Sequence, residues 1–314
     1  MATVLYGNGG IKYDYASVQS GMFTKVTSSQ VVITTTEGWA ITGYGNFNLS
    51  NGSITGGTIT AYSVNRPDGQ LYVSVSGLSL SVSTYNNYAN RGDGLGLFKH
   101  ILSGNDSTSG GTGNDTFLST SGYDFYYGGG GTDIVYYATT RASHTITKNT
   151  TNNTMTVSKP FTSAVDSLDK TVERIHFADN KAVAFDVDGT AGQVYRMYQA
   201  AFDRKPDVGG LGLWIATMES GMSLADVAAG FANSQEFKNL YGASPTTAEL
   251  VTRLYQNVLH RAPDSGGFQH WTGLLDSGQL AVKDVMVGFS ESLENKAAVM
   301  GSISGGMEYN LWLG

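Results

Sequence analysis

Acidic residues with a fixed spacing to glycine are the clearest chemical signal in the sequence. An aspartate recurs every nine residues, and a glycine stands two positions before each one. The four aspartates are Asp106, Asp115, Asp124 and Asp133, and the four glycines are Gly104, Gly113, Gly122 and Gly131. Glycine permits sharp turns that aim several carbonyls at one point, and carbonyl and carboxylate oxygens are the ligands that Ca²⁺ prefers. The spacing therefore predicts a calcium-binding segment.

The elements that must position these oxygens follow from the same period. Each unit divides into six loop residues and three strand residues, and the strand triplets are STS, TFL, FYY and IVY. We expect the central residue of each triplet to point inward, namely Thr108, Phe117, Tyr126 and Val135. Without a cation, the carboxylates of neighbouring loops would repel one another, and the glycine-rich loops have much backbone entropy to lose. Metal binding and folding should therefore be coupled.

Residues 101–136 resemble the calcium-binding β-roll of the RTX, or hemolysin-type repeat, family. The resemblance implies that two nonapeptides form one coil and that loops eighteen residues apart share a Ca²⁺ ion. It pairs Asp115 with Asp133, whose loops GGTGND and GGGGTD are complete, and Asp106 with Asp124, whose loops ILSGND and STSGYD lack the leading glycines. One good site and one weaker site are expected. The implied ligand residues are Asp115, Asp133, Gly111, Gly113, Gly129 and Gly131 for the first, and Asp106, Asp124, Gly104 and Gly122 for the second.

Further acidic residues follow the nonapeptides. The segment HTITKNTTNNTMTVSK at 144–159 predicts a hairpin with an Asn-rich turn. The resemblance implies that residues 133–188 form strands that cap the roll. Five aspartates there are candidate extra ligands, although we expect solvated turn carboxylates instead: Asp166, Asp169, Asp179, Asp186 and Asp188.

Three regions are predicted along the chain. Residues 1–98 form a β-rich N-terminal region, because two segments, 29–44 and 71–85, alternate apolar and polar residues. Between those segments, residues 45–64 fit two strands joined by a Gly-Gly turn better than short stacked coils. Residues 99–189 form the β-roll with its capping strands, and residues 190–314 form an all-α domain that includes the expected C-terminal secretion signal. The predicted fold class is therefore multidomain, β followed by all-α.

The all-α region contains an internal repeat. VYRMYQAAFDRKPDVGGLGLW at 194–214 aligns with VTRLYQNVLHRAPDSGGFQHW at 251–271. The pattern resembles a domain of unknown function from type-I-secreted bacterial proteins and, distantly, the linker domain of phycobilisomes. Each copy is predicted to form three helices, and the two copies are expected to pack on each other. Structural roles are expected for the matched residues, with a sugar or protein groove lined by Trp and Arg as the alternative. The matched residues are Arg204 and Arg261, Pro206 and Pro263, Asp207 and Asp264, and Trp214 and Trp271.

Composition narrows the function classes. The chain has 314 residues, a net charge of −7 and no cysteine, which argues against nucleic-acid binding and excludes disulfides and thiolate sites. No transmembrane stretch is visible. The five histidines are scattered and no catalytic motif appears, so we expect no enzymatic activity. His144 and His176 are the pair on which a catalytic alternative would depend.

The functional hypothesis follows from the resemblance. It implies export through a type I system of a Gram-negative bacterium, with Ca²⁺ folding the roll outside the cell. The leading hypothesis is a non-enzymatic, calcium-stabilised structural protein of the cell surface or extracellular matrix that self-assembles as an S-layer, biofilm or filament subunit. The alternatives are a carbohydrate-binding or adhesion module and, less favoured, a small glycan-active enzyme.

Overall fold

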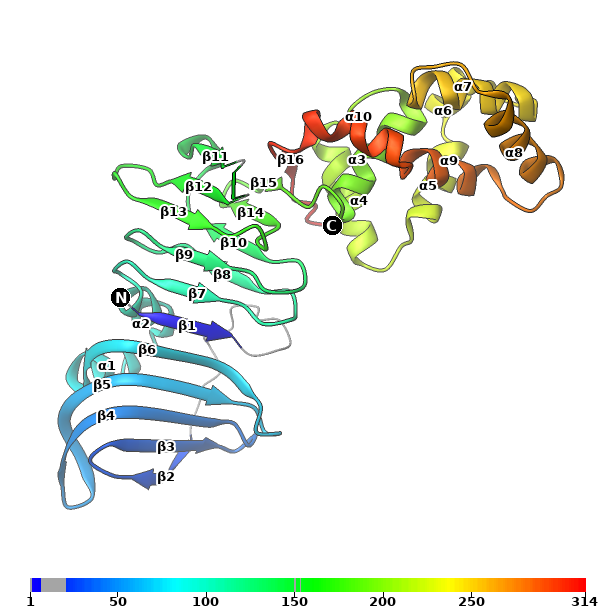
Figure 1. Ribbon diagram of the computed structural model, residues 1–314. Coiled ribbons are helices and arrows are strands. Elements are labelled where there is room, and N and C mark those ends of the chain that lie inside the picture. The colour runs from blue at the N-terminus through cyan, green and yellow to red at the C-terminus, as the bar shows by residue number, and fades with distance from the viewer. Residues whose placement is uncertain (1, 7–20, 150, 153) are drawn as a thin grey trace. The chain divides into compact units, whose positions relative to one another are not determined.

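The computed structural model describes residues 2–6, 21–149, 151–152 and 154–314. The chain forms two compact units, Met1–Asp179 and Asn180–Gly314. The first is built mainly of strands and the second mainly of helices, as the predicted fold class requires (Figure 1). The expected boundary near residue 98 lies inside the first unit.

An antiparallel meander opens the described part of the first unit after residue 20. Its neighbouring strands pair in chain order, as their alternating sequences predict. The turn between β4 and β5 lies at Asn51-Gly52, where both residues have positive φ. The predicted Gly-Gly turn was therefore wrong: Gly56 and Gly57 lie within a strand, opposite Asn48 and Phe47. The strands are β2 (Gly21–Val26), β3 (Gln30–Thr35), β4 (Ala40–Ser50), β5 (Ser53–Asn65) and β6 (Leu71–Ser81).

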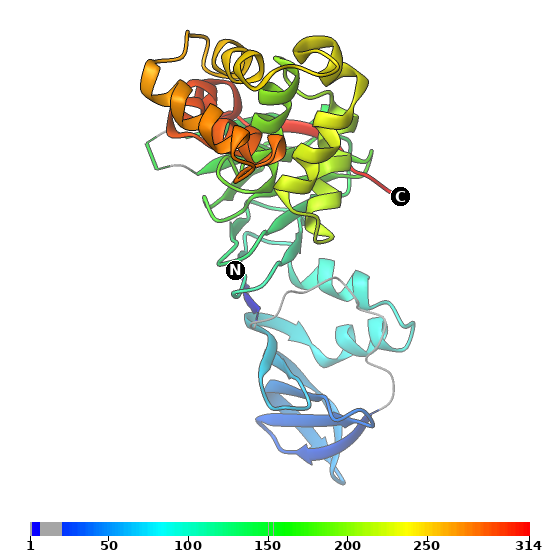
Figure 2. The same cartoon turned by 90° about the vertical axis from the view of Figure 1, so that its right-hand side faces the viewer.

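Two short helices interrupt the predicted β-rich region. Helix α1 (Val82–Ala89) begins where the Ser81 side chain accepts a hydrogen bond from the Thr84 N–H, and α2 (Gly94–Ile101) begins at the cap Asp93. The alternating pattern around residues 82–85 suggested strand, but the serine cap ends β6 there. The first nonapeptide loop thus starts at the end of a helix. Figure 2 shows both helices beside the meander.

The roll follows. Its strands are β7 (Ser107–Ser109), β8 (Thr116–Leu118), β9 (Phe125–Tyr127) and β10 (Ile134–Tyr137). The pairings β7–β9 and β8–β10 are parallel, with residues eighteen apart side by side, so the predicted coil length is confirmed. The four triplet centres are buried, as predicted, at exposures of 5% for Thr108, 0% for Phe117, 2% for Tyr126 and 0% for Val135.

Strands from outside the nine-residue period extend the roll at both ends. Strand β1 (Thr3–Tyr6) pairs in parallel with β7, β13 (Val165–Leu168) with β9, and β14 (Arg174–Phe177) with β10. Between β10 and β13 lies the predicted hairpin of β11 (Ile146–Lys148) and β12 (Met155–Ser158). In Figure 1 these strands form successive layers of one stack.

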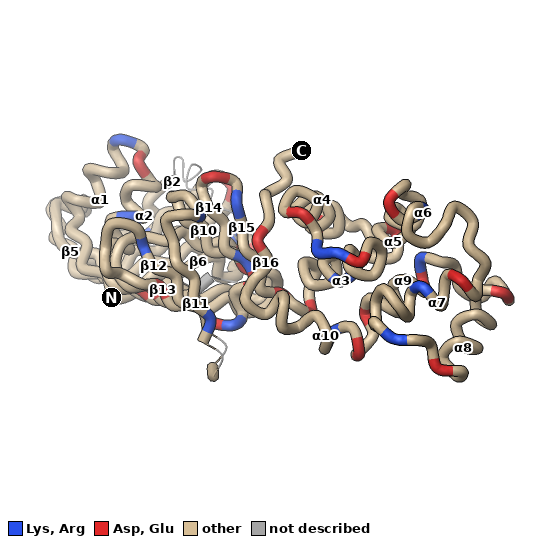
Figure 3. Tube along the Cα trace, turned by 90° about the horizontal axis from the view of Figure 1, so that it is seen from above, with Lys and Arg blue, Asp and Glu red and all other residues tan. Residues whose placement is uncertain are grey.

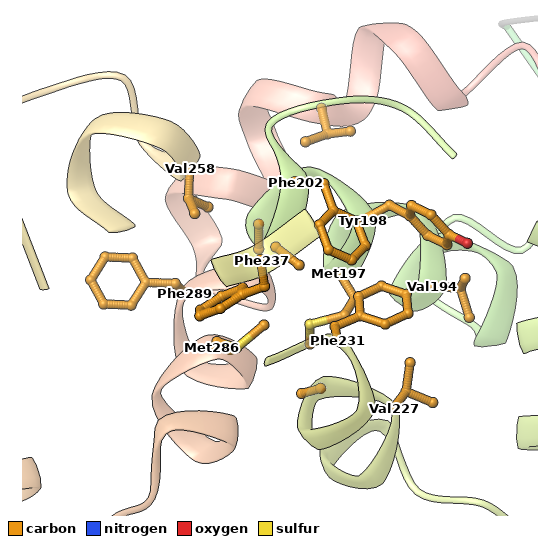
Figure 4. Close-up of a cluster of buried hydrophobic side chains, with 14 of the residues drawn as sticks. Val194, Met197, Tyr198, Phe202, Val227, Phe231, Phe237, Val258, Met286 and Phe289 are labelled. Atoms are coloured by element: carbon orange, nitrogen blue, oxygen red, sulfur yellow. The ribbon is translucent and has the colours of Figure 1, made fainter. Parts of the chain in front are cut away.

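The second unit contains eight helices and a two-stranded antiparallel pair, β15 (Lys181–Ala184) with β16 (Met307–Asn310). Each sequence copy forms four helices and not the predicted three, because a serine, Ser234 or Ser292, caps an additional helix. One buried core contains side chains from both copies, so their packing on each other is confirmed (Figure 4). The helices are α3 (Thr190–Phe202), α4 (Val208–Glu219), α5 (Leu224–Asn233), α6 (Gln235–Tyr241), α7 (Thr247–Val258), α8 (Ser265–Asp276), α9 (Val282–Ser290) and α10 (Leu293–Ile303).

Charged residues are sparse, and most of the trace in Figure 3 carries none. In the parts of the chain that the structure describes, no helix is both long and apolar enough to cross a membrane.

Candidate metal centre

The parallel register brings the predicted acidic residues together in pairs. Asp106 precedes β7 and Asp124 precedes β9, whereas Asp115 and Asp133 precede β8 and β10. The backbone N–H of Asp115 donates to Asp133 Oδ1 at 2.7 Å, and the N–H of Asp106 donates to Asp124 Oδ1 at 3.1 Å. Each carboxylate therefore holds the preceding coil through a buried, charge-assisted hydrogen bond.

The same contact continues past the periodic segment. The N–H of Asp124 donates to Asp166 Oδ1 at 3.0 Å, and that of Asp133 donates to Glu173 Oε2 at 2.8 Å. Before the first repeat, the Ala2 N–H donates to Asp106 Oδ1. We call Asp106, Asp124 and Asp166 the first ladder, and Asp115, Asp133 and Glu173 the second ladder.

Two of these residues correct the sequence analysis. Asp166 is fully buried and not a solvated turn carboxylate. Glu173 was not among the predicted ligands. Asp166 lies within β13 and Glu173 directly precedes β14, but the hairpin inserted after β10 breaks the nine-residue period, so no regular spacing marks either residue.

Glycine and asparagine complete the loops. Gly122, Gly129 and Gly131 have φ of 105°, 101° and 115°, and a Cβ on any of them would lie under 3.0 Å from a carbonyl oxygen of the preceding coil. Those oxygens belong to the other predicted ligands Gly104, Gly111 and Gly113, respectively. Two asparagines, missed from the sequence, bridge coils: Asn105 Oδ1 accepts from the Tyr123 N–H at 3.0 Å, and Asn114 Oδ1 accepts from the Thr132 N–H at 2.8 Å.

A buried lysine closes the first ladder. Lys159 Nζ lies 2.8 Å from Asp124 Oδ2 and 2.6 Å from Asp166 Oδ1. It also donates to the carbonyl oxygens of Thr120 and Gly122, at 2.6 and 2.7 Å. Burial raises the pKa of Asp124 and of Asp166, and the ammonium of Lys159 opposes that rise in both.

Two ladder carboxylates have an oxygen without a partner. Asp106 Oδ2 and Asp133 Oδ2 are buried and accept no hydrogen bond. The pKa of Asp133 is raised to about 7, chiefly by burial, with a smaller contribution from the Glu173 and Asp115 carboxylates, while the hydrogen bond from the Asp115 N–H opposes the rise. An uncompensated buried carboxylate is costly, so a cation at these oxygens would stabilise the fold.

The residues present fit a calcium ion. Loop carbonyls and carboxylates of adjacent coils lie close together, and orphaned carboxylate oxygens are among them. No cluster of three or more His, Cys, Asp or Glu side chains suited to a metal occurs among the described residues. Sites in this roll would thus combine two carboxylates with backbone carbonyls.

The remaining candidate ligands have local roles. Asp169 Oδ1 accepts from the Thr171 N–H and hydroxyl, and Asp179 Oδ1 from the Arg141 N–H. In the second unit, Asp186 Oδ2 accepts from the Ala191 N–H, while Asp188 is largely exposed and lies 3.8 Å from Lys296.

Of the two histidines of the catalytic alternative, His144 lies just before β11 and His176 lies in β14. His144 Nδ1 contacts the Ser158 carbonyl at 2.5 Å and Nε2 contacts the Thr139 hydroxyl at 2.7 Å, so both ring nitrogens are engaged. Burial and, to a smaller extent, the charge of Arg174 lower the pKa of His176 to about 4.

The matched residues of the helical repeat make equivalent contacts. Asp207 and Asp264 cap α4 and α8 by accepting from the N–H three residues on, at 2.7 and 2.8 Å. Arg204 pairs with Glu236, and Arg261 with Glu294, each through two hydrogen bonds.

The repeat tryptophans and prolines also have equivalent places in the two copies. Trp214 packs on Phe231 with ring centroids 5.1 Å apart, and Trp271 on Phe289 at 5.3 Å, so each tryptophan contacts its own copy. Pro206 and Pro263 lie beyond the ends of α3 and α7.

Comparison with known proteins gives one result. The model of a family described as "Domain of unknown function (DUF4214)" matches residues 189–241 and 228–299, so the helical repeat is similar to that family. No curated protein and no solved structure matched the chain.

Proposed function

We propose that the chain is an extracellular, calcium-stabilised structural protein whose roll folds fully only when Ca²⁺ binds between its coils. The observation that carries this proposal is the pair of unpartnered, buried carboxylate oxygens in the ladders, Asp106 Oδ2 and Asp133 Oδ2. Such groups favour an oxygen-seeking cation, and calcium is plentiful outside cells. The resemblance of the nonapeptides to RTX repeats supports type I secretion from a Gram-negative bacterium.

Self-assembly is proposed as the role of the folded protein. Among the described strands, β2 is the last in the eleven-stranded sheet, and Met22 and Phe23 on it are 79% and 62% exposed. A strand edge with exposed apolar side chains can pair with another chain. A surface lattice, biofilm matrix or filament would use such an edge.

Light scattering of the purified full chain tests the proposal. Millimolar Ca²⁺ should produce polymers, and chelation with EGTA should return them to smaller species. The variant Phe23→Lys should bind calcium unchanged but assemble less, because charge on an edge strand opposes pairing. The control Phe161→Lys alters a fully exposed apolar residue away from that edge. A single species with and without calcium would refute assembly, and failure to bind calcium would refute the whole proposal.

A second candidate, glycan binding, is favoured by one feature. Phe125 and Tyr127 lie with ring centroids 4.2 Å apart, and Tyr127 is 44% exposed. Aromatic faces of this kind can pack against sugars. Calcium-dependent binding to a glycan array that Tyr127→Ala abolishes would favour this function over assembly.

A further inference from the structure

Lys159 shows what a cation in a loop of this roll contacts. Its ammonium is surrounded by carbonyl oxygens from the second and fourth positions of the loop 119–124, by the aspartate in the sixth position, and by the acidic residue one coil further on. Its side chain is 8% exposed, so it is a fixed internal charge. The four oxygens, from Thr120, Gly122, Asp124 and Asp166, form a template for the other loops.

Nine residues later the same positions recur in the loop 128–133. The second, fourth and sixth positions are Gly129, Gly131 and Asp133. Glu173 takes the place that Asp166 has in the first ladder, because each accepts the N–H of the preceding ladder aspartate, at 2.8 and 3.0 Å respectively. The two loops are thus equivalent in backbone register and in acidic residues.

The two loops differ in what neutralises their carboxylates. Asp124 Oδ2 contacts Lys159, whereas the equivalent Asp133 Oδ2 is buried without a hydrogen-bond partner. That oxygen is directed at its own loop, since a Cβ built on Gly128 would lie 2.4 Å from it. Asp133 is fully buried, so water does not solvate its charge.

We propose that the first ladder ends on a protein cation and the second ladder on a divalent metal ion of the Ca²⁺ class. The metal ligands are the carbonyl oxygens of Gly129 and Gly131, Asp133 Oδ2 and the Glu173 carboxylate. The inference rests on the proposed calcium binding and adds a site that lies partly outside the nonapeptides, with a ligand that no repeat supplies.

Charge balance agrees with this assignment. Lys159 neutralises one of the two carboxylates near it, and the other receives hydroxyl donors: Asp166 Oδ2 accepts from Ser119 at 2.8 Å and from Tyr137 at 2.9 Å. At the end of the second ladder, a divalent ion would neutralise both carboxylates at once.

Calorimetric titration of the full chain with CaCl₂ tests the metal site. Glu173→Gln keeps an acceptor for the Asp133 N–H but removes the charge. We expect the affinity of one bound Ca²⁺ to fall at least about tenfold, with the other sites unchanged. The matched control Glu37→Gln, in an exposed turn, should titrate like the wild type. Unchanged titration of Glu173→Gln would overturn the inference while leaving calcium binding intact, whereas a wild type that binds no calcium would overturn both.

Lys159→Met provides the reciprocal test. Removing the ammonium leaves the template oxygens around Asp124 and Asp166 open to a metal ion. We expect one additional bound Ca²⁺, a lower melting temperature in EGTA than wild type, and recovery in calcium. Lys170→Met, an exposed lysine between β13 and β14, is the control. Loss of stability that calcium does not restore, or no added Ca²⁺, would contradict the equivalence of the two loops.

Discussion

The roll and the helical unit are both built by repetition, but different interactions hold their repeats together. In the roll, buried carboxylates accept backbone N–H groups of the preceding coil, and Lys159 supplies a protein cation at one loop. In the helical unit, the repeats share one apolar core, and the matched Arg–Glu pairs lie at its surface. The roll should therefore need an external cation, and the helical unit should not.

The largest loss of stability is expected from a substitution in the core of the helical unit, and it tests whether that unit is stable without calcium. Phe289 is 2% exposed and packs on both Trp271 and Tyr255. Phe289→Ala should lower the free energy of unfolding of the helical unit by about 3–5 kcal/mol, because it opens a cavity. Thermal unfolding should show the same loss in calcium and in EGTA. A loss that calcium reverses would mean that the helical unit also depends on the ion.

The equivalent residue of the first copy is the matched test. Phe231 is 3% exposed and contacts Trp214, as Phe289 contacts Trp271. Phe231→Ala should lower the free energy of unfolding of the helical unit by a similar amount, and the loss should again be the same with and without calcium.

A smaller effect is expected from the loop glycines. Gly129 and Gly221 have φ of 101° and 111°, but a Cβ on Gly129 would lie 2.1 Å from the Gly111 carbonyl, whereas one on Gly221 meets no atom within 4 Å. Gly221→Ala should lower the free energy of unfolding by about 1 kcal/mol because of backbone strain. Gly129→Ala should lower it by at least about 2 kcal/mol, because the spacing between coils must also change. Chemical denaturation measures both. Equal costs would show that the coils separate easily.

The smallest effect is expected at the surface of the repeat. Arg204 is paired with Glu236, but both side chains are about two-fifths exposed, at 40% and 44%. Arg204→Met should therefore lower the free energy of unfolding by less than about 1 kcal/mol. Added salt should reduce this difference between variant and wild type further. A cost of several kcal/mol at high salt would show that the ion pair, rather than the core, sets the stability of the repeat.

Periodic features of the sequence were enough to predict much of the fold. The nine-residue period predicted the triplet strands and the inward Phe117 and Val135, and the resemblance to RTX repeats implied the pairing of Asp115 with Asp133. Long-range contacts of residues outside that period were not predicted. Lys159 reaches the first ladder from the hairpin segment, and Glu173 joins the second ladder only through the register of β14 on β10. Such contacts depend on tertiary structure, which local spacing does not record.

The positions at which helices begin were also not predicted from the local apolar pattern. Ser81 ends an alternating strand pattern by capping α1, and Ser234 splits a predicted helix in two. In both cases one side-chain hydrogen bond outweighed the apolar pattern around it.

Hydrogen exchange of the full chain, with and without millimolar Ca²⁺, tests the central claim most directly. Calcium should slow exchange of the amides of Asp106, Asp115 and Asp133 by at least about tenfold, equivalent to about 1.4 kcal/mol of added local stability. The amides of α5 and α9 should exchange at the same rates in both conditions. Equal protection of the roll amides with and without calcium would contradict the account.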